Sequence, residues 1–337
     1  MTDRKDRIAA FLAPGGWAAA SRVPVAGDAS NRSYARLTRA DGVTAILMDA
    51  PPQSGEDVRP FIAMADHLRD AGLSAPEIYR ADTEAGLLLI EDFGEAQFAR
   101  LIAEDPARQQ PLYRDACDLL LALREMPKPP LQTCDGDWLA DMIAPVFEWY
   151  APETDPALVA RFDAAFRPLA QEVAAAGTIV MLRDYHVENL MLLEERQGIA
   201  RVGLLDFQDA MLAHPAYDLV SILQDARREV PLEMETAMLS YYLGRSGENP
   251  ERFRMAYAML GLQRNLRILG VFARLCLRDG RPRYIDMIPR LHGYVLRNLT
   301  HPQLSPLAPL LAIALPDPTA DFLQTLKSRC QIRPSQP

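Results

Sequence analysis

One β-rich island within a long helical stretch limits the possible folds of this chain more than any other feature. From about residue 96 onward, apolar residues recur at the spacing of helices. Helices are expected near 137–150, 156–175, 231–243, 251–278 and 284–298. Residues 178–207 break this pattern with short apolar runs, two of which flank the polar turn 194–198. The second part of the chain is therefore predicted to be mainly helical, with one small β-hairpin inside it.

The first ninety-odd residues have a different character and mix short strands with a helix. Residues 23–27 and 33–38 flank the small-residue segment GDASNR, which predicts a hairpin. Apolar residues at helical spacing after Val58 predict one helix. Further strands are expected at 45–48, 78–80 and 87–90. These pieces are typical of a small antiparallel sheet.

Together the two parts predict an α+β fold with two lobes. The smaller lobe, at 1–93, holds the antiparallel sheet, and the larger lobe, at 94–330, is mainly helical. Hydrophobic residues make up 49% and charged residues 24% of the chain, which is ordinary for a folded globular protein. The polar, proline-closed tail 331–337 is expected to be flexible.

The net charge of −9 argues against nucleic acid as a partner, because duplex binding requires a basic face. Arginines between 252 and 283 are interpreted as decorating solvated helix faces, with binding of a small anion as the alternative. No apolar run is long enough to span a bilayer, and the N-terminus lacks the pattern of a signal peptide. The four cysteines lack metal-site spacing, which predicts reduced thiols and a cytoplasmic protein. The sequence does not fix an oligomeric state, and a monomer is the default expectation.

The island also carries the chemistry, in the segments LRDYHVENLMLL and GLLDFQDA. Asp184 lies five residues before Asn189, and Asp206 closes the strand after the hairpin. Phosphoryl transfer from ATP needs a carboxylate at the acceptor hydroxyl and hard oxygen ligands for Mg²⁺. Taken singly, these residues are ordinary loop caps or strand ends. Taken together, they predict a kinase that uses ATP and Mg²⁺, with Asp184 as the catalytic base.

This segment resembles the catalytic segment of the aminoglycoside phosphotransferase and choline kinase superfamily, which is related to the protein kinases. The family pattern is HxDxxxxN followed by a strand that ends in a metal-binding Asp. Asp184, Asn189 and Asp206 match it, whereas Leu182 stands where the family usually has His. The resemblance implies a bilobal, protein-kinase-like fold with Asn189 and Asp206 as metal ligands. Asp218, in HPAYDL, resembles a family residue that braces the catalytic loop.

The N-terminal part resembles the same family in two further places. GDASNRSYARL, at 27–37, resembles the hairpin that covers the nucleotide, which implies that Ser30, Asn31 and Arg32 lie at the phosphates. LLLIEDFGE, at 87–95, resembles the hinge between the lobes. That likeness implies that the backbone from Glu91 to Phe93 contacts the adenine.

One position departs from the family pattern. The third strand usually carries a Lys or Arg that contacts the phosphates, but here it reads AILMDAPP, with Met48 near that position. Arg32 and Arg36 in the preceding hairpin are the candidates to replace it. The missing lysine also leaves open a non-catalytic regulatory protein with a kinase fold, which the retained Asp184 disfavours.

Over residues 25 to 300 the sequence resembles the bacterial N-acetylmuramate/N-acetylglucosamine kinases, in segments such as LMDAPP and LQRNLRILGVFARLCLRDGRPRYIDMIPRL. The resemblance implies phosphorylation of the anomeric hydroxyl of cell-wall amino sugars in peptidoglycan recycling. A kinase of another small hydroxyl acceptor, an aminoglycoside or an amino alcohol, remains the alternative, and the acidic net charge supports it. A kinase assay separates these enzymes from the regulatory protein.

A sugar site also needs polar side chains near the catalytic carboxylate. Several lie within a few residues of the predicted metal ligands, and others lie on a later helix. The candidate substrate-binding residues are His186, Glu188, Gln208, Asp209, Arg264 and Asn265. Of these, Arg264 is the candidate partner for the lactyl carboxylate of muramate.

Overall fold

The computed structural model describes residues 4–25 and 31–330. The predicted phosphate-contacting residue Ser30 and the predicted flexible tail 331–337 lie outside these residues. The chain forms two compact units. The sheet unit comprises Met1–Asp115 and Val187–Ala210, and the helical unit comprises Ala116–His186 and Met211–Pro337. An antiparallel sheet with a larger helical part confirms the predicted α+β class, while the division into lobes at residue 93 stays a prediction.

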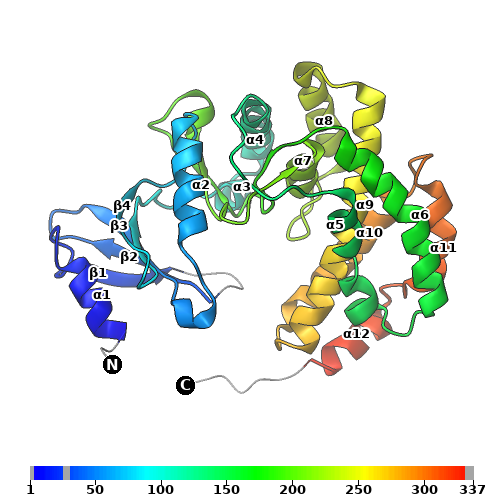
Figure 1. The fold of residues 1–337 in the computed structure, drawn as a ribbon, viewed down its shortest axis with the longest axis horizontal. Helices are drawn as coiled ribbons and strands as arrows, with labels where there is room; N and C mark the ends of the chain where they lie inside the picture. Colours follow the sequence, from blue (N-terminus) through cyan, green and yellow to red (C-terminus); the bar gives the residue numbers. More distant parts are fainter. Residues whose placement is uncertain (1–3, 26–30, 331–337) are drawn as a thin grey trace. The chain divides into compact units, whose positions relative to one another are not determined.

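The sheet unit is built on a five-stranded antiparallel sheet (Figure 1). The hairpin predicted around GDASNR is the β1–β2 pair, in which Val23 lies opposite Arg36. In order across the sheet, the strands are β1 (Ser21–Val25), β2 (Ser33–Thr38), β3 (Thr44–Asp49), β5 (Leu87–Ile90) and β4 (Ile78–Asp82).

The two faces of this sheet differ because successive side chains of a strand point to opposite sides. One face carries Leu37, Leu47 and Leu89, which form a buried cluster with residues of helix α1 (Arg4–Leu12). The opposite face carries Tyr34 and Met48, which lie directly across from each other in the β2–β3 pair. The face that packs on α1 is therefore an apolar core.

A second hairpin belongs to the sheet unit and ends in the predicted metal-binding residue. Its strands are β7 (Leu190–Leu192) and β8 (Val202–Leu204). The backbone N–H of Leu204 donates to the carbonyl of Ser74 at 2.7 Å, which fixes the hairpin to the segment after helix α2 (Arg59–Asp70). The remaining helix of this unit is α3 (Phe98–Glu104), and α4 (Gln109–Leu123) runs from this unit into the helical unit.

The helical unit is built around α9 (Pro250–Leu277), along which α10 (Ile288–Asn298) packs (Figure 1). Gly270 allows α9 to approach the neighbouring backbone, since a Cβ there would lie 2.1 Å from the carbonyl carbon of Pro145. The other elements are β6 (Ile179–Met181), β9 (Met211–Ala213), α5 (Gly136–Asp141), α6 (Pro156–Ala175), α7 (Ala216–Leu223), α8 (Leu232–Ser246), α11 (Ala308–Ala314) and α12 (Ala320–Ser328).

One expectation about secondary structure needs correction. The helix predicted near 137–150 is two elements, because α5 ends at Asp141 and a π-helical turn follows at Val146–Tyr150, after Pro145. Proline lacks the N–H that a continuous helix needs. The strand expected at the start of the island is β6, and it pairs with β9 of the helical unit.

The expectation of reduced thiols is wrong for one pair, because Cys276 and Cys330 form a disulfide. The two residues are 54 positions apart in the sequence. Packing of α12 beside α9 brings them together, and no spacing rule reveals such a contact. Cys117 and Cys134 are free and buried.

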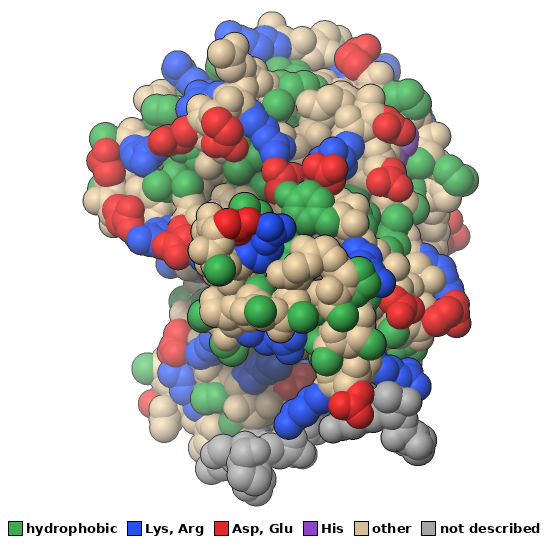
Figure 2. Space-filling model, turned by 90° about the vertical axis from the view of Figure 1, so that its left-hand side faces the viewer, with side chains coloured by type: hydrophobic (Ala, Val, Ile, Leu, Met, Phe, Trp, Pro, Cys, Tyr) green, Lys and Arg blue, Asp and Glu red, His purple; other side chains and the backbone are tan. Residues whose placement is uncertain are grey.

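The described surface mixes charges of both signs. Lys, Arg, Asp and Glu side chains are interspersed on the face seen in Figure 2. Exposed ion pairs such as Arg59–Glu84, with an Nη2–Oε1 distance of 3.0 Å, contribute to this pattern. Within residues 4–25 and 31–330, no helix has both the length and the apolar character needed to cross a bilayer.

Candidate active site

Asp184 follows β6 on a loop that helix α7 holds in place. The carboxylate of Asp218, in the first turn of α7, accepts the backbone N–H groups of Leu182 at 2.6 Å and Arg183 at 2.9 Å. Arg183 has a φ of 71°, a left-handed conformation that is uncommon for a residue with a side chain. Asp218 therefore fixes the backbone that directly precedes the half-buried Asp184.

Burial strongly affects the ionisation of Asp218, whose side chain is only 3% exposed. Burial raises the pKa of Asp218 to about 7, although the two backbone N–H donors and the Arg264 guanidinium lower it. The carboxyl group is thus poised between its neutral and charged forms near neutral pH.

His186 is buried in the helical unit, with 2% of its surface exposed. Burial lowers the pKa of His186 well below its ordinary value, and the cationic Arg227 and Arg264 lower it further. The imidazole is therefore neutral at neutral pH, which suits a hydrogen-bonding role better than an ionic one.

Arg264 lies on α9 and is only 5% exposed, which corrects the expectation that the arginines of this region sit on solvated faces. Its guanidinium carbon lies 5.8 Å from the centre of the Tyr217 ring. Among the described residues, no carboxylate forms an ion pair with Arg264. The Arg264 guanidinium instead acts on two buried carboxyl groups, since its charge acts to lower the pKa of both Asp218 and Asp225.

Asn265, the neighbouring predicted residue, has its partners inside the helical unit. Its Nδ2 donates to Gln224 Oε1 at 2.8 Å and to the carbonyl of Gly261 at 2.7 Å. Asn298 of α10 donates to the same Gln224 oxygen at 2.9 Å. These bonds tie α9 to α10, so the side-chain amide of Asn265 is engaged in the interior.

The sheet unit brings four of the predicted residues together at the end of the β7–β8 hairpin. Asn189 Nδ2 lies 3.5 Å from Asp206 Oδ2, and the carbonyl of Asn189 accepts the N–H of Leu205 at 3.0 Å. Gln208 Nε2 donates to Asp206 Oδ1 at 2.8 Å and lies 3.4 Å from Asp209 Oδ2. Asn189 therefore lies beside Asp206, with its side-chain Nδ2 directed at the Asp206 carboxylate.

This donor set fits a magnesium ion. A carboxylate and an amide oxygen are hard ligands, and Mg²⁺ in nucleotide-binding sites usually takes only one or two protein carboxylates besides phosphate oxygens and water. Residues 4–25 and 31–330 contain no cluster of three or more His, Cys, Asp or Glu side chains that could hold a metal ion. Asp206 has a φ of 59°, a conformation that Asp and Asn adopt more readily than most residues.

Glu188, the remaining predicted substrate-binding residue, is half-buried in the sheet unit. Its carbonyl accepts a hydrogen bond from Gln97 Nε2. Gln97 also forms a β-bridge with Met191, so the start of the hairpin is held against the segment before α3.

The predicted nucleotide-binding residues lie in the segments that adjoin strands β2 and β5 of the five-stranded sheet. Arg32 Nε lies 2.6 Å from Glu56 Oε2. The backbone N–H of Asn31 donates to the other oxygen of Glu56 at 3.2 Å, and Asn31 Nδ2 donates to the carbonyl of Ser54 at 3.2 Å. Glu56 therefore holds both of the described residues at the end of the GDASNR segment.

The segment after β5, predicted to contact adenine, is anchored within the sheet unit. The N–H of Glu91 donates to the carbonyl of Glu77 at 2.8 Å, and its carboxylate pairs with Arg196. The Phe93 ring packs directly on β8, because a Cβ on Gly203 would lie 2.8 Å from a carbon of that ring. Hydrogen bonding at Glu91 and packing of the Phe93 ring on β8 thus hold the two ends of this segment.

Two residues of this region went unnoticed in the sequence. Glu56 has no distinguishing pattern in the sequence, yet it is the ion-pair partner of Arg32. Tyr34 was quoted within the hairpin motif without a role, yet burial and the carboxylate of Asp206 raise its pKa. The alternation of side chains along a strand could have linked these residues, because residues 32, 34 and 36 point to the same side of β2 and of the residues just before it.

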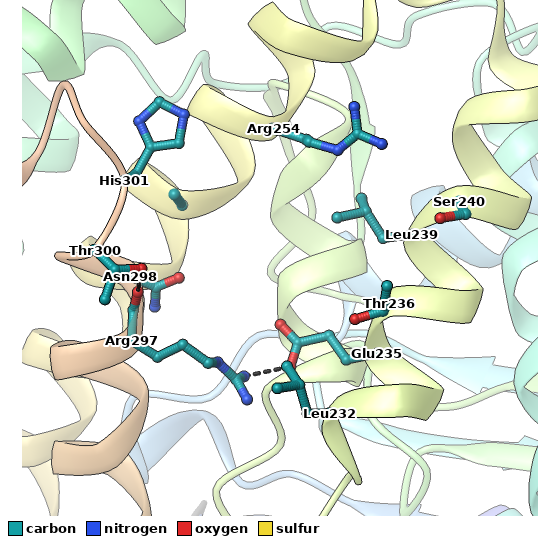
Figure 3. A pocket seen from close by; sticks show the side chains of 11 residues that line it. Leu232, Glu235, Thr236, Leu239, Ser240, Arg254, Arg297, Asn298, Thr300 and His301 are labelled. Atoms are coloured by element: carbon teal, nitrogen blue, oxygen red, sulfur yellow. Dashed lines mark hydrogen bonds and ion pairs between the residues drawn. The ribbon is translucent and has the colours of Figure 1, made fainter.

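A separate pocket of about 300 Å³ lies among α8, α9 and α10 in the helical unit (Figure 3). Glu235 and Arg297 face each other there as an ion pair, drawn as a dashed line. Tyr257 also donates to Glu235 Oε1 at 2.9 Å. The pocket is not lined by any of the predicted site residues.

Comparisons with known proteins show which family the chain belongs to. The chain matches the phosphotransferase enzyme family over residues 21–256. It is 40% identical to the N-acetylmuramate/N-acetylglucosamine kinase of Caulobacter vibrioides, over 87% of this chain and 92% of that protein. The protein of the same name from Pseudomonas putida is 33% identical, over 87% and 88% of the two chains.

Among solved structures, the choline kinase LicA from Streptococcus pneumoniae aligns with a TM-score of 0.61 over 87% of this chain and 97% of that chain. Its identity of 14% supports the fold alone. The kinase-like fold and the resemblance found in the sequence are therefore confirmed. The chain belongs to the phosphotransferase enzyme family.

Proposed function

We propose that this small-molecule kinase transfers the γ-phosphoryl group of ATP to the anomeric hydroxyl of N-acetylmuramate and N-acetylglucosamine, in peptidoglycan recycling. The observation that carries the proposal is the 40% identity to a kinase named for these sugars, over nearly the full length of both chains. Three further relatives with the same printed name are 31% to 33% identical over 85% to 87% of this chain. The proposal includes Mg²⁺ as the metal, a cytoplasmic location and a monomeric enzyme.

Asp184 is the proposed base. The bonds from Asp218 hold the loop before Asp184, so the carboxylate would meet the acceptor with little loss of conformational entropy. It would align the anomeric hydroxyl and accept its proton as the new O–P bond forms. An anomeric hydroxyl is more acidic than other sugar hydroxyls, so a carboxylate is a sufficient base.

Asn189 and Asp206 are the proposed metal ligands. A bound Mg²⁺ would neutralise charge on the ATP phosphates. Gln208, which donates to Asp206 Oδ1, would hold that carboxylate in place for the ion. Asn31, Arg32 and the adjoining Ser30 are the proposed phosphate contacts. The backbone from Glu91 to Phe93 is the proposed adenine contact.

The proposed sugar-binding residues are polar groups that lie near Asp184 and Asp206 in the sequence or on α9. The neutral, buried His186 and the carboxylates of Glu188 and Asp209 are suited to sugar hydroxyls. Arg264, a buried guanidinium on α9, is the proposed partner of the carboxylate that muramate has and glucosamine lacks. Replacing Arg264 with Gln should therefore weaken the use of N-acetylmuramate more than that of N-acetylglucosamine.

An acceptor panel tests this function. The purified protein is assayed with ATP and Mg²⁺ on N-acetylmuramate, N-acetylglucosamine, choline and kanamycin, and products are identified by phosphorus NMR. We expect sugar 1-phosphates and no turnover of the cationic acceptors. If the protein phosphorylates only choline or only kanamycin, the acceptor is an amino alcohol or an aminoglycoside and the proposed sugar acceptor is wrong. ATP binding without any product would indicate a non-catalytic protein.

A further inference from the structure

The pocket among α8, α9 and α10 is separate from the residues of the proposed active site, and it has the size of a small-molecule site. Its volume of about 300 Å³ lies at the lower end of the range that is typical of ligand pockets. One face of α8 lines it with Leu232, Thr236 and Ser240, which recur at helical spacing. The remaining wall comes from α9, from the end of α10 and from residues just after it. An occupant would therefore meet both apolar and hydroxyl-bearing side chains.

The charge that an occupant would meet in this pocket is positive. The Glu235 side chain is only 7% exposed, and Arg297 pairs with its Oε2. Its other oxygen accepts hydrogen bonds from Tyr257 at 2.9 Å and from Gln224 at 3.1 Å. The Arg297 side chain is 30% exposed, and its guanidinium has no other hydrogen-bond partner among the described residues. The carboxylate is thus covered, while the guanidinium that pairs with it is open to the pocket.

Two further nitrogen-bearing side chains line the same pocket. Arg254, on α9, is exposed, and within residues 4–25 and 31–330 its only side-chain contact of this kind is a hydrogen bond to the carbonyl of Pro250 at 3.4 Å. Burial lowers the pKa of His301, so its ring is neutral at neutral pH. Its Nδ1 accepts a backbone N–H at 3.4 Å, which leaves Nε2 as the donor. In the view of Figure 3, Arg254 and His301 lie at one end of the pocket and the Glu235–Arg297 pair lies at the other.

These groups fit the phosphate ester of a sugar or another polyol. Two guanidinium groups and one imidazole donor match the oxygens of a doubly charged phosphate better than those of a neutral ligand. The hydroxyls of Thr236 and Ser240 are exposed and have no hydrogen-bond partner in the described part of the chain, so they can bind ligand hydroxyls. Leu232 and Leu239 offer an apolar surface to the carbon skeleton.

One wall of the pocket belongs to a buried polar network that reaches the loop of the proposed base. Gln224 Nε2 donates to Glu235 Oε1 and to Asn298 Oδ1, both at 3.1 Å, and both acceptors line the pocket. Gln224 directly follows α7. At the other end of α7, Asp218 holds the backbone N–H groups that precede Asp184. Helix α7 therefore connects the pocket wall with the Asp184 loop inside the helical unit.

An occupant with a phosphate group would compete with Glu235 for the guanidinium of Arg297. A buried carboxylate that loses its cation is costly, and it takes up a proton instead. Hydrogen bonds to a neutral acceptor are weaker than those to a charged one. The bond from Gln224 to Glu235 would weaken, and the end of α7 would be held less firmly.

We propose that the pocket among α8, α9 and α10 is a regulatory site for a sugar phosphate or another polyol phosphate. Binding there slows turnover because it loosens the loop that carries Asp184. The binding of the ligand does not depend on the proposed sugar kinase activity, whereas the slowing of turnover rests on the proposed role of Asp184.

Calorimetry with glucitol 6-phosphate tests the binding site, because this polyol phosphate has no anomeric hydroxyl that the enzyme could phosphorylate. Inorganic phosphate and glucitol are the comparison ligands, and each carries only half of the proposed chemistry. Arg254→Gln removes a cation of the pocket. Arg252→Gln is the matched control, because Arg252 is exposed on the same helix and does not line the pocket. Asp184→Asn shows whether the probe binds in the active site instead.

We expect the wild type, Arg252→Gln and Asp184→Asn to bind glucitol 6-phosphate equally well. Arg254→Gln should bind it at least about tenfold more weakly, as for loss of a charge-assisted hydrogen bond. Inorganic phosphate and glucitol should each bind the wild type at least about tenfold more weakly than the ester does.

Two further measurements test the regulatory effect. Saturating glucitol 6-phosphate should lower the kcat of the wild type about fivefold, at saturating ATP and sugar, and should not change the kcat of Arg254→Gln. In hydrogen exchange, the backbone amides of Leu182 and Arg183 should exchange faster when the probe is bound, because Asp218 then holds them less firmly.

Several results would overturn the inference. The site is refuted if the wild type does not bind the probe, or if Asp184→Asn loses binding while Arg254→Gln retains it. Equal binding of inorganic phosphate would refute the polyol phosphate as the ligand. Binding without any change in kcat or in amide exchange would refute the regulatory role. A wild type that binds the probe but phosphorylates no sugar would refute the proposed function and leave the binding site standing.

Discussion

The carboxylate of Asp218 accepts the backbone N–H of Arg183 at 2.9 Å, one residue before Asp184. Arg183 takes a left-handed φ of 71° at that point, which costs conformational energy. The bond from Asp218 offsets this cost and sets the direction in which the chain enters Asp184. A residue 35 positions away in the sequence thus positions the proposed base.

The raised pKa of Asp218 predicts a specific dependence of stability on pH. The pKa of Asp218 in the folded protein, about 7, lies above its ordinary value of 3.8. The protonated carboxyl group therefore adds to the free energy of unfolding in full below about pH 4, and this contribution is lost by about pH 7. Asp218→Asn removes this dependence. The difference in the free energy of unfolding between the wild type and the variant should therefore change by roughly 2 kcal/mol, to the disadvantage of the wild type, between pH 5 and pH 7.

Denaturant unfolding of both proteins at the two pH values measures this difference. Asn can also accept only one of the two backbone N–H groups through its single oxygen, so the variant should be slower in turnover at both pH values. A gap between the two unfolding free energies that is constant with pH would mean that Asp218 is ionised across this range.

Gly203 is predicted to be intolerant of any side chain. A Cβ at this position would lie 2.8 Å from the Phe93 ring, so Gly203→Ala must displace the segment proposed to contact adenine. We expect a loss of about 1–3 kcal/mol in the free energy of unfolding, typical of overpacking, and weaker adenosine binding. Gly244→Ala is the control, because nothing lies within 4 Å of its added carbon, and it should be neutral or stabilising. Unaltered stability and adenosine affinity in Gly203→Ala would show that Phe93 can move freely.

Asp206→Asn is predicted to remove metal-dependent turnover while keeping the fold. Asn tolerates the φ of 59° at this position and preserves the side-chain shape, so the backbone should not change. Loss of the charged ligand should lower kcat at least about a hundredfold and raise the Mg²⁺ concentration needed for half-maximal rate. The control is Asp41→Asn, whose exposed carboxylate pairs with Arg39. A wild-type Mg²⁺ response in Asp206→Asn would exclude Asp206 as a metal ligand.

The Cys276–Cys330 disulfide predicts a redox-dependent stability. Under oxidising conditions Cys330→Ser should lose about 2–4 kcal/mol of unfolding free energy, because the bond restricts the unfolded chain. With excess reductant the wild type and the variant should have the same stability. Equal stability of the two proteins without reductant would mean that the thiols stay reduced, as the sequence suggested.

The chemical groups of the site were predictable because they are close in sequence. Asp184 lies five positions before Asn189, and one hairpin separates Asn189 from Asp206, so local spacing indicated a shared role. The structure confirms that the hairpin places Asn189 beside Asp206. The strands were also predictable, because short apolar runs between turn residues are local signals.

Features that depend on packing between distant segments were not predictable. Arg264 reads as one of many arginines on a helix, and only the packing around α9 shows that it is buried. Glu56 pairs with Arg32 across 24 positions, and Cys276 joins Cys330 across 54. Neither contact follows from residue type or local periodicity, since both depend on how complete elements pack.

The measurement that tests the central claim most directly is sugar phosphorylation by Asp184→Asn beside the wild type, with ATP, Mg²⁺ and N-acetylmuramate. ATP binding is measured on the same samples, and Asp41→Asn is carried as a control for loss of an exposed carboxylate. We predict that the wild type and the control form the sugar 1-phosphate, whereas Asp184→Asn binds ATP normally but turns over at least about a thousandfold more slowly. Wild-type turnover by Asp184→Asn would contradict the account, because the base would then be another residue.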